Sequence, residues 1–280
     1  MPELPEVETI TKGLNLKFSG KTCTKIVFHR KDLRYPIPQQ TIRSCCLETP
    51  ILSFKRRAKY ILMETQKGSI VFHLGMTGSI HQEVSSVPLR PHTHAVFSFY
   101  ENKQKKVYLH YVDPRRFGLI SAIKGAVTGK EKYFQDLGLE PLEHKNLGKK
   151  LMQLGAHKKQ AIKKFIMDSK IIVGVGNIYA SESLYEARVH PETPAGNLKN
   201  KHFIAIGLAI QKILRKAIKD GGTTLKDYVN TDGKPGYFKQ KLKVYDREQQ
   251  PCLTCKQKIV RLVQGGRSTF FCPYCQKEKK

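Results

Sequence analysis

Two short motifs near the C-terminus, Cys252-Leu253-Thr254-Cys255 and Cys272-Pro273-Tyr274-Cys275, decide the fold of the last part of the chain. Sixteen residues separate them. Two such knuckles bring four thiolates to the corners of a tetrahedron around Zn²⁺, and four sulfur ligands leave no open position for water. The same residues would also allow two disulfides or a redox pair, which do not suit a basic cytosolic protein. The spacing therefore predicts one structural zinc ion.

The segment between the two knuckles predicts a short β-hairpin. Ile259–Leu262 and Ser268–Phe271 are strand-like, and Gly265-Gly266 is typical of the connecting turn. Arg267 follows this turn and is expected to point outward. A lone exposed arginine is often only solvated, but in a strongly basic chain contact with a phosphate group is an equally reasonable interpretation.

The net charge of +27 restricts the class of partner. Lysine and arginine number 50 against 23 acidic residues, and the basic residues are scattered along the whole chain. Such an excess indicates nucleic acid or an acidic membrane face. No apolar run approaches the ~18–20 residues of a membrane span, and the acidic first residues lack the apolar region of a signal peptide. We therefore expect a cytoplasmic protein without a membrane partner.

The odd number of cysteines, seven, favours a reducing compartment over a secreted disulfide framework. Three of them, Cys23, Cys45 and Cys46, have no partner at ligand spacing. We interpret these three as packed, inert thiols.

The pattern of apolar residues before the zinc motifs predicts a helix, followed by a β-rich domain and then a helical domain. Val7, Ile10, Leu14 and Phe18 recur on one helical face. Short strand-like runs with regular spacing follow and indicate a sandwich or barrel: Lys25–Phe28, Ile61–Glu64, Ser69–Leu74, Ala95–Tyr100, Lys106–Tyr111 and Gly118–Ile123. Phe203–Lys219 is a clear amphipathic helix that Gly221-Gly222 ends. The expected organisation is a β-sandwich domain over 1–132, a linker over 133–150, a helical domain over 151–240 and the zinc hairpin over 241–280.

The first residues carry a candidate for nucleophilic chemistry. Pro2 follows the initiator Met, whose removal would leave a secondary amine with a pKa near ~8. A following helix N-terminus lowers that pKa and favours the neutral nucleophile. Attack on a sugar C1′ gives an iminium ion that acidifies C2′, and Glu3 is placed to protonate the sugar ring oxygen. Without further context, a proline and an acidic residue that simply open a helix would explain the same pattern.

The context comes from a resemblance. The start, Met1-Pro2-Glu3-Leu4-Pro5-Glu6-Val7-Glu8-Thr9, closely resembles that of the bacterial formamidopyrimidine-DNA glycosylases, which repair oxidised guanine. Further stretches resemble, in order, the catalytic-lysine motif of this family, its two intercalation loops, its helix–two-turns–helix motif and its lesion-covering loop: Arg56–Tyr60, His73–Gly78, Asp113–Gly118, Gly174–Glu182 and Asp232–Phe238. The zinc hairpin completes a match over the full chain.

The resemblance implies a role for each matching residue. Pro2 would be the Schiff-base nucleophile and Glu3 the general acid. Lys59 would act in β-elimination and in contact with the lesion, and Arg267 would contact phosphate and assist δ-elimination. Met76, Arg115 and Phe117 would fill the gap that the flipped base leaves, with Arg115 facing the orphaned cytosine. His92, Lys158 and Asn177 would hold the DNA backbone. The loop Thr231–Gly236 would cover the flipped base, although Pro235 has no N–H to offer.

The residues themselves leave some alternatives open. Lys59 follows other basic residues, so it also suits a simple phosphate-holding cluster. Met76 would pass for a core residue, and His92 for a packed loop histidine, outside the context of the motifs. His92 and His94 would also suit a metal pair, but no third ligand is evident. The two glycines of Gly174–Gly176 are not a dinucleotide fingerprint and suit the approach of a phosphate to a helix end.

The resemblance implies a two-domain, monomeric DNA repair enzyme. DNA would lie in a basic cleft between the domains, and oxidised purines such as 8-oxoguanine and formamidopyrimidines would be flipped and excised, followed by β,δ-elimination. The nearest alternative is the endonuclease VIII type, which prefers oxidised pyrimidines; Leu4 and Arg115–Phe117 argue against it. An alternative of another class is a non-catalytic zinc-ribbon protein that binds nucleic acid, which would leave Pro2 and Glu3 unexplained.

Overall fold

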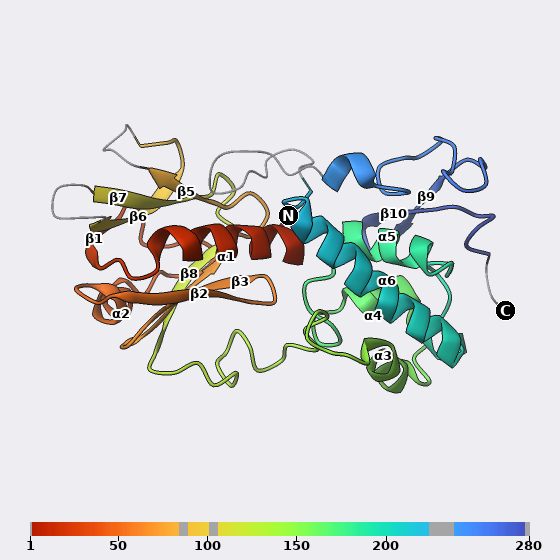
Figure 1. Cartoon of the computed structure of the whole chain (residues 1–280), viewed down its shortest axis with the longest axis horizontal. Helices are drawn as coiled ribbons and strands as arrows, with labels where there is room; N and C mark the ends of the chain where they lie inside the picture. The colour runs from red at the N-terminus through yellow and green to blue at the C-terminus, as the bar shows by residue number, and fades with distance from the viewer. Residues whose placement is uncertain (1, 84–88, 101–105, 224–237, 278–280) are drawn as a thin grey trace. The chain divides into compact units, whose positions relative to one another are not determined.

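The computed structural model describes residues 2–83, 89–100, 106–223 and 238–277 (Figure 1). It divides into two compact units, one formed by 1–135 and 221–237 and the other by 136–220 and 238–280. The predicted lesion-covering loop, Thr231–Gly236, lies outside the described residues. None of the helices within the described ranges is both long and apolar enough to span a membrane.

The first unit begins with helix α1, Leu4–Phe18. As the sequence predicts, Val7, Ile10, Leu14 and Phe18 share its buried face. The helix packs on the strand β2, Ile51–Arg57, and the Phe18 ring lies 6.3 Å from the Phe54 ring. This burial fixes α1, and therefore the residues at its N-terminus, on the sheet.

Two antiparallel sheets of four strands each form most of the rest of this unit (Figure 1). One has the order β1-β6-β7-β5, with β1 Cys23–Phe28, β5 Ser79–Glu83, β6 Thr93–Tyr100 and β7 Lys106–Val112. The other has the order β2-β3-β4-β8, with β3 Tyr60–Thr65, β4 Gly68–His73 and β8 Leu119–Lys124. Phe72 of β4 contacts Phe97 of β6 and Tyr111 of β7, so the apolar core lies between the sheets. The predicted β-sandwich is confirmed.

Three elements of this unit were not predicted from the sequence: β2, β5 and the short helix α2, Gln39–Cys46. Helix α2 carries two of the three isolated cysteines. Cys23, Cys45 and Cys46 are all buried, as expected for packed thiols. A hydrogen bond with Cys23 and burial raise the pKa of the Cys46 thiol, which keeps it protonated.

The second unit is helical, with α3 Leu147–Gly155, α4 Ile162–Met167, α5 Asn177–Glu186 and α6 Asn200–Lys219, and the short 3-10 helices Ala195–Asn197 and Phe238–Lys241. Helix α6 matches the predicted amphipathic helix. Its Gly207 lies so close to Gly148 of α3 that an added Cβ would come within 2.5 Å of the Gly148 nitrogen. Two small residues therefore let these helices pack closely.

The predicted zinc hairpin consists of β9, Val260–Gln264, and β10, Arg267–Phe271. Gln264 pairs with Arg267 across a two-residue turn in which Gly265 and Gly266 have φ of 56° and 72°. Two successive positive φ values are what a tight right-twisted hairpin needs, and glycine adopts them without steric cost. The hairpin prediction is confirmed, and the strand ends lie no more than two residues from those expected.

Candidate active site and zinc centre

The N-terminus of α1 holds the first two predicted catalytic residues. Pro2 is half-buried, and Glu3, at the N-cap of α1, is only 3% exposed. The Glu3 N–H donates a hydrogen bond of 2.8 Å to Glu6 Oε2, and Glu6 Oε1 accepts one of 2.8 Å from the N–H of Thr223. The buried Glu6 carboxylate thus ties the backbone beside Pro2 to that of Thr223. This role of Glu6 was not predicted from the sequence.

The predicted lysine, Lys59, lies in the two-residue turn between β2 and β3, after Ala58 with φ of 54°. Arg56 holds this turn against α1. Its Nε donates to Glu8 Oε2 at 2.7 Å, and its Nη1 donates to the Ala58 carbonyl oxygen at 3.0 Å. Lys59 and the Pro2–Glu3 end therefore belong to one braced unit, although neither Arg56 nor Glu8 was predicted to act there.

His73 lies at the end of β4, beside the Lys59 turn. Its ring centroid is 4.8 Å from that of Tyr60, and its Nδ1 accepts a hydrogen bond of 3.1 Å from the Gly75 N–H. Burial, and then the positive charges of Lys59 and Arg34, lower the pKa of His73 from 6.5 to about 4. The imidazole is therefore neutral at pH 7 and can accept this bond.

The two predicted intercalation loops lie against each other. Thr77 Oγ1 donates to Asp113 Oδ1 at 2.7 Å and accepts from the Arg115 N–H at 3.2 Å. Asp113 Oδ2 accepts from the Gly118 N–H at 2.8 Å. Gly75, with φ of 57°, leaves no room for a side chain, because an added Cβ would lie 2.5 Å from the Phe117 carbonyl carbon. The loops thus form one rigid support.

This support presents apolar side chains to solvent. Met76 is 41% exposed and Phe117 47% exposed, and the Arg115 guanidinium lies 4.8 Å from the centre of the Phe117 ring. Exposed apolar groups on a rigid base are typical of a binding surface. The structure therefore brings together Met76, Arg115 and Phe117, the three residues assigned to the gap in the DNA.

His92, which was predicted to hold the DNA backbone, also lies in this unit. It is exposed and has φ of 65°. Its carbonyl oxygen accepts the Asp113 N–H at 3.1 Å, which places it beside the loop Asp113–Gly118, one of the two predicted intercalation loops. His94 is instead buried, with Nε2 2.8 Å from the Asp113 carbonyl oxygen. The two histidines therefore have different surroundings and do not join a metal cluster among the described residues.

In the second unit, Asn177 begins α5 and contacts the zinc hairpin. Its Oδ1 accepts from Lys163 Nζ at 2.6 Å, and its Nδ2 donates to the Ser268 carbonyl oxygen at 2.9 Å. Ser268 follows Arg267, which is exposed on β10. Asn177 and the residue next to Arg267 are therefore in direct contact.

Lys163 was not predicted, yet it is 1% exposed and also donates to Thr269 Oγ1 at 2.7 Å. A buried ammonium group needs such partners. The predicted backbone ligand Lys158 is exposed, and its carbonyl oxygen accepts the Gly196 N–H at 2.9 Å. No local signal in the sequence marks Lys163, because Lys164 beside it in α4 has the same apolar neighbours and is exposed.

Four cysteines of the zinc unit form a compact cluster. The sulfur atoms of Cys252, Cys255, Cys272 and Cys275 all lie within 4.8 Å of one another. Two of the separations, Cys252 to Cys275 and Cys255 to Cys272, are 3.9 Å and 3.4 Å. A tetrahedral site with Zn–S bonds of about 2.3 Å needs sulfur separations of about 3.8 Å. The donor set fits one fully coordinated zinc ion.

The surroundings of Cys252 favour the thiolate, the form that binds a metal ion. Burial raises the pKa of this thiol, but hydrogen bonds from the Tyr185 hydroxyl and from the N–H groups of Cys255 and Thr254 outweigh burial and lower it to about 6. A thiol that loses its proton readily binds Zn²⁺ readily.

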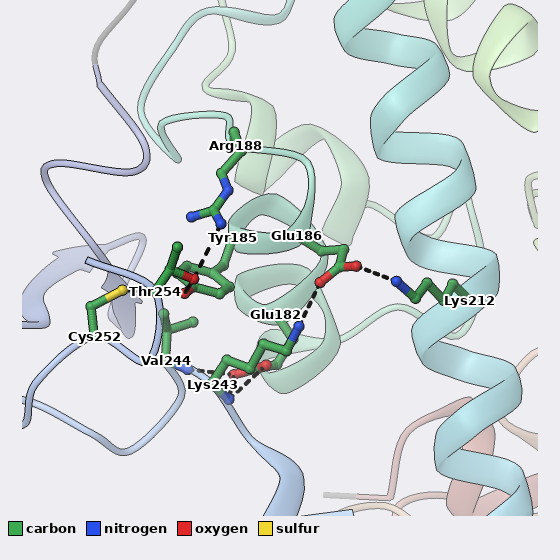
Figure 2. A network of polar contacts seen from close by, with 9 residues as sticks. All are labelled: Glu182, Tyr185, Glu186, Arg188, Lys212, Lys243, Val244, Cys252 and Thr254. Carbon is green, nitrogen blue, oxygen red and sulfur yellow. Dashed lines mark hydrogen bonds and ion pairs between the residues drawn. The ribbon is translucent and has the colours of Figure 1, made fainter. Parts of the chain in front are cut away.

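Helix α5 anchors the segment that leads into the zinc unit (Figure 2). The buried Glu182 carboxylate accepts the N–H groups of Lys243, Val244 and Tyr245. One turn later, Glu186 pairs with Lys243 Nζ at 2.8 Å and with Lys212 of α6. Hydrogen bonds from these two lysines lower the pKa of Glu186 to about 2.

Comparisons with known proteins agree with this arrangement. Family models match residues 1–120 as a formamidopyrimidine-DNA glycosylase N-terminal domain, 137–229 as a formamidopyrimidine-DNA glycosylase H2TH domain and 249–277 as a zinc finger found in FPG and IleRS. The zinc finger match and the cysteine cluster together confirm the predicted structural zinc.

Full-length relatives carry the same family name. The formamidopyrimidine-DNA glycosylase of Ruthia magnifica subsp. Calyptogena magnifica is 44% identical over 276 residues, which cover 99% of this chain and 100% of the relative. That of Legionella pneumophila subsp. pneumophila strain Philadelphia 1 is 42% identical over 276 residues, covering 99% of this chain and 98% of the relative.

Solved structures match the whole chain as well. The MutM (FPG) protein of Thermus thermophilus has 33% sequence identity and a TM-score of 0.86, with 100% of both chains covered. A Lactococcus lactis FPG mutant in complex with Fapy-dG containing DNA has 28% identity and a TM-score of 0.88, covering 99% of this chain and 100% of that chain. The chain therefore belongs to the formamidopyrimidine-DNA glycosylase family.

Proposed function

We propose that this chain excises oxidised purines from double-stranded DNA and then cleaves the strand, with the Pro2 amine as its nucleophile. Relatives at 42–44% identity are named for formamidopyrimidine excision, and similar solved chains bind Fapy-dG, carbocyclic 8-oxo-G or an abasic site in DNA. The observation that carries the proposal is the buried Glu3 beside Pro2 at the N-terminus of α1, braced to the Lys59 turn by Arg56.

The first bond change is displacement of the damaged base. The neutral Pro2 amine attacks C1′, and the base leaves with the electron pair of the glycosidic bond. The N–H proton that the attacking amine gives up neutralises the departing base. Glu3 donates a proton to the sugar ring oxygen, so that the ring opens and an iminium forms between Pro2 and C1′. The N-terminus of α1 favours the neutral amine, because its partial positive charge disfavours protonation.

Strand cleavage follows from the electron-withdrawing iminium. Removal of the acidified C2′ proton, with Lys59 as the base, expels the 3′ phosphate by β-elimination. A second elimination expels the 5′ phosphate, whose charge Arg267 stabilises. Water then hydrolyses the iminium, which frees the Pro2 amine and leaves an aldehyde at C1′.

DNA distortion is assigned to the rigid support formed by the two loops. Met76 and Phe117 replace the stacking that the flipped nucleotide loses, and Arg115 donates hydrogen bonds to the unpaired partner base. His92, Lys158 and Asn177 contact phosphates; at Asn177 the N-terminus of α5 adds its partial positive charge. Bound zinc supplies no chemistry to the reaction and only fixes the hairpin that carries Arg267.

Borohydride trapping tests this function directly. Protein with a free N-terminus should form a stable cross-link with an 8-oxoguanine duplex, because borohydride reduces the iminium to an amine. A form extended at the N-terminus should form none and still bind DNA, whereas the same extension at the C-terminus should leave trapping intact. Efficient trapping by the N-terminally extended form would move the nucleophile to another amine, with Lys59 the first to test.

We further infer that the enzyme acts as a monomer in the bacterial cytoplasm. One chain carries every residue to which the proposed reaction assigns a role, so the reaction needs no second copy. Sedimentation of the protein alone and with one duplex equivalent should give masses for one chain and for a one-to-one complex.

A further inference from the structure

A tyrosine from the helical part of the second unit contacts one of the zinc ligands. Tyr185 lies in the last turn of α5, is buried, and has its hydroxyl oxygen 3.2 Å from Cys252 Sγ and 2.8 Å from Thr254 Oγ1 (Figure 2). Its ring packs in the small apolar cluster that contains Cys252 and Cys272. Packing accounts for the ring, whereas the position of the hydroxyl calls for a separate explanation.

The chemistry of a zinc-bound cysteine fixes the direction of these hydrogen bonds. A ligating Cys252 is a thiolate and has no proton to give, so the Tyr185 hydroxyl is the donor. Its oxygen then accepts the Thr254 hydroxyl, and the Thr254 oxygen accepts Arg188 Nη2 at 3.2 Å. Three hydrogen bonds therefore run in one direction, from the Arg188 cation through Thr254 and Tyr185 to the Cys252 sulfur (Figure 2).

The backbone at Arg188 gives a second, independent observation. Arg188 has φ of 57°, and the N–H groups of Arg188 and Val189 close the end of α5 on the carbonyl oxygens of Tyr185 and Leu184. Glycine is the usual residue at this left-handed position, because other residues adopt it with strain. The contacts of its side chain therefore explain why arginine occupies a position that favours glycine. The guanidinium lies 5.0 Å over the Tyr185 ring and donates to Thr254.

We propose that Tyr185, supported by Thr254 and Arg188, is a positioning residue of the zinc centre that holds the Cys252 thiolate in its ligand position and slows loss of the metal. Four thiolates and one Zn²⁺ carry a net formal charge of about −2, which a chain of donors ending in a cation offsets. Helix α5 thereby contributes to zinc retention although it supplies no ligand.

The test compares the zinc-loaded full-length protein with Tyr185→Phe, which keeps the ring and removes only the hydroxyl. Zinc release into an excess of a coloured chelator should be about 10–100-fold faster in the variant, the usual effect of removing a partner of a metal ligand. Tyr274→Phe is the matched control, because Tyr274 lies between Cys272 and Cys275 but is exposed and stacks on Lys277. Its release rate should equal that of the unaltered protein.

A spectroscopic arm separates a hydrogen bond to sulfur from general loosening. With Co²⁺ in place of zinc, the thiolate-to-metal charge-transfer band should move to lower energy in Tyr185→Phe, because an unbonded thiolate gives up its electron more easily. The band should stay in place in Tyr274→Phe. Thr254→Val, which removes the donor to Tyr185, should give a smaller shift in the same direction.

Arg188→Gly separates zinc retention from helix stability. Glycine relieves the left-handed backbone, so the metal-free protein should be as stable as before or more stable, while zinc release should be faster. A merely structural arginine would move both quantities in the same direction. Release from Tyr185→Phe and Thr254→Val at the rate of the unaltered protein, with an unmoved cobalt band, would overturn the proposal.

Discussion

Arg56 Nε donates a 2.7 Å hydrogen bond to Glu8 Oε2, which joins the turn that carries Lys59 to the helix that begins beside Pro2. The Arg56 side chain is only 6% exposed, and its Nη1 also binds the Ala58 carbonyl oxygen. A charged pair of good geometry between a buried and a half-buried side chain holds its partners in one arrangement, and losing one member leaves the other poorly solvated. Arg56 and Glu8, which have no chemical role in excision, thus hold the Lys59 turn against the helix that follows Pro2.

Arg56→Met should lower the free energy of unfolding by about 1–3 kcal/mol, because a half-buried carboxylate and a carbonyl oxygen each lose a donor. It should also slow single-turnover excision by about tenfold or more through displacement of Lys59, with little change in DNA affinity. Lys12→Met is the control, since Lys12 pairs with the same Glu8 at 3.4 Å but is 63% exposed. An excision rate unaffected by Arg56→Met would separate the Lys59 turn from catalysis.

Thr77→Val should uncouple the two intercalation loops while keeping the shape of the side chain. It removes the donor to Asp113 and the acceptor of the Arg115 N–H. We expect lesion excision to slow by about tenfold, because Met76 and Arg115 lose their fixed separation. Binding of undamaged DNA should stay the same. Thr24→Val, which removes a longer bond of 3.3 Å on β1, is the control. Equal effects of both variants would contradict a role for the loop contact.

Acid should destabilise the first unit through His73. Its pKa of about 4 in the folded state lies below the usual 6.5, so the unfolded chain takes up a proton first as the pH falls. The stability that neutral His73 contributes is therefore full above pH 6.5 and is lost progressively down to about pH 4, by about 3 kcal/mol. Protonation would also set an N–H against the Gly75 N–H.

His73→Asn offers a carbonyl acceptor that does not titrate in this range. Urea midpoints at pH 7.5 and 4.5 should differ less in the variant than in the unaltered protein. Some acid sensitivity remains, because burial also lowers the pKa of His81 and His110. Identical pH dependence in both proteins would show that His73 is not a source of acid sensitivity.

Local patterns in the sequence were sufficient for several elements of the fold. The apolar face of α1, the strands rich in β-branched and aromatic residues and the zinc hairpin all have their determinants within a few neighbouring residues. β2 was missed because its sequence does not alternate between apolar and polar residues. Leu52 is apolar but exposed on the outer face, and the last three residues of the strand are all basic. β5 was missed because it is largely polar, with His81 buried where an apolar residue is expected.

The supporting residues of the site are harder to predict than the motifs. Lys163 has partners 14, 105 and 106 residues away, so nothing near it in sequence distinguishes it from the many solvated lysines. Glu6 likewise meets Thr223 across 217 residues. Such contacts depend on tertiary packing, whereas the motif residues were found because family resemblance preserves their order.

The base opposite the lesion should control the rate of excision through Arg115. This residue is exposed, and its guanidinium is steadied over the Phe117 ring at 4.8 Å. Cytosine presents two acceptors, O2 and N3, to one rigid donor fork, whereas adenine sets a donor against a donor. This mismatch costs roughly 1–3 kcal/mol. We therefore expect 8-oxoguanine to be excised faster opposite C than opposite A by about one to two orders of magnitude.

Single-turnover excision on duplexes that differ only in the opposite base measures this preference. Arg115→Ala should bring the two rates together, because the discriminating fork is gone. Arg116→Ala should change the overall rate and leave the ratio intact, since Arg116 has φ of 59° and lies beside Arg115 without its contact to Phe117. Equal rates opposite C and A in the unaltered enzyme would remove Arg115 from base recognition. A preference for oxidised pyrimidines over 8-oxoguanine in the same assay would instead favour the endonuclease VIII type, because that type is defined by its preference for oxidised pyrimidines.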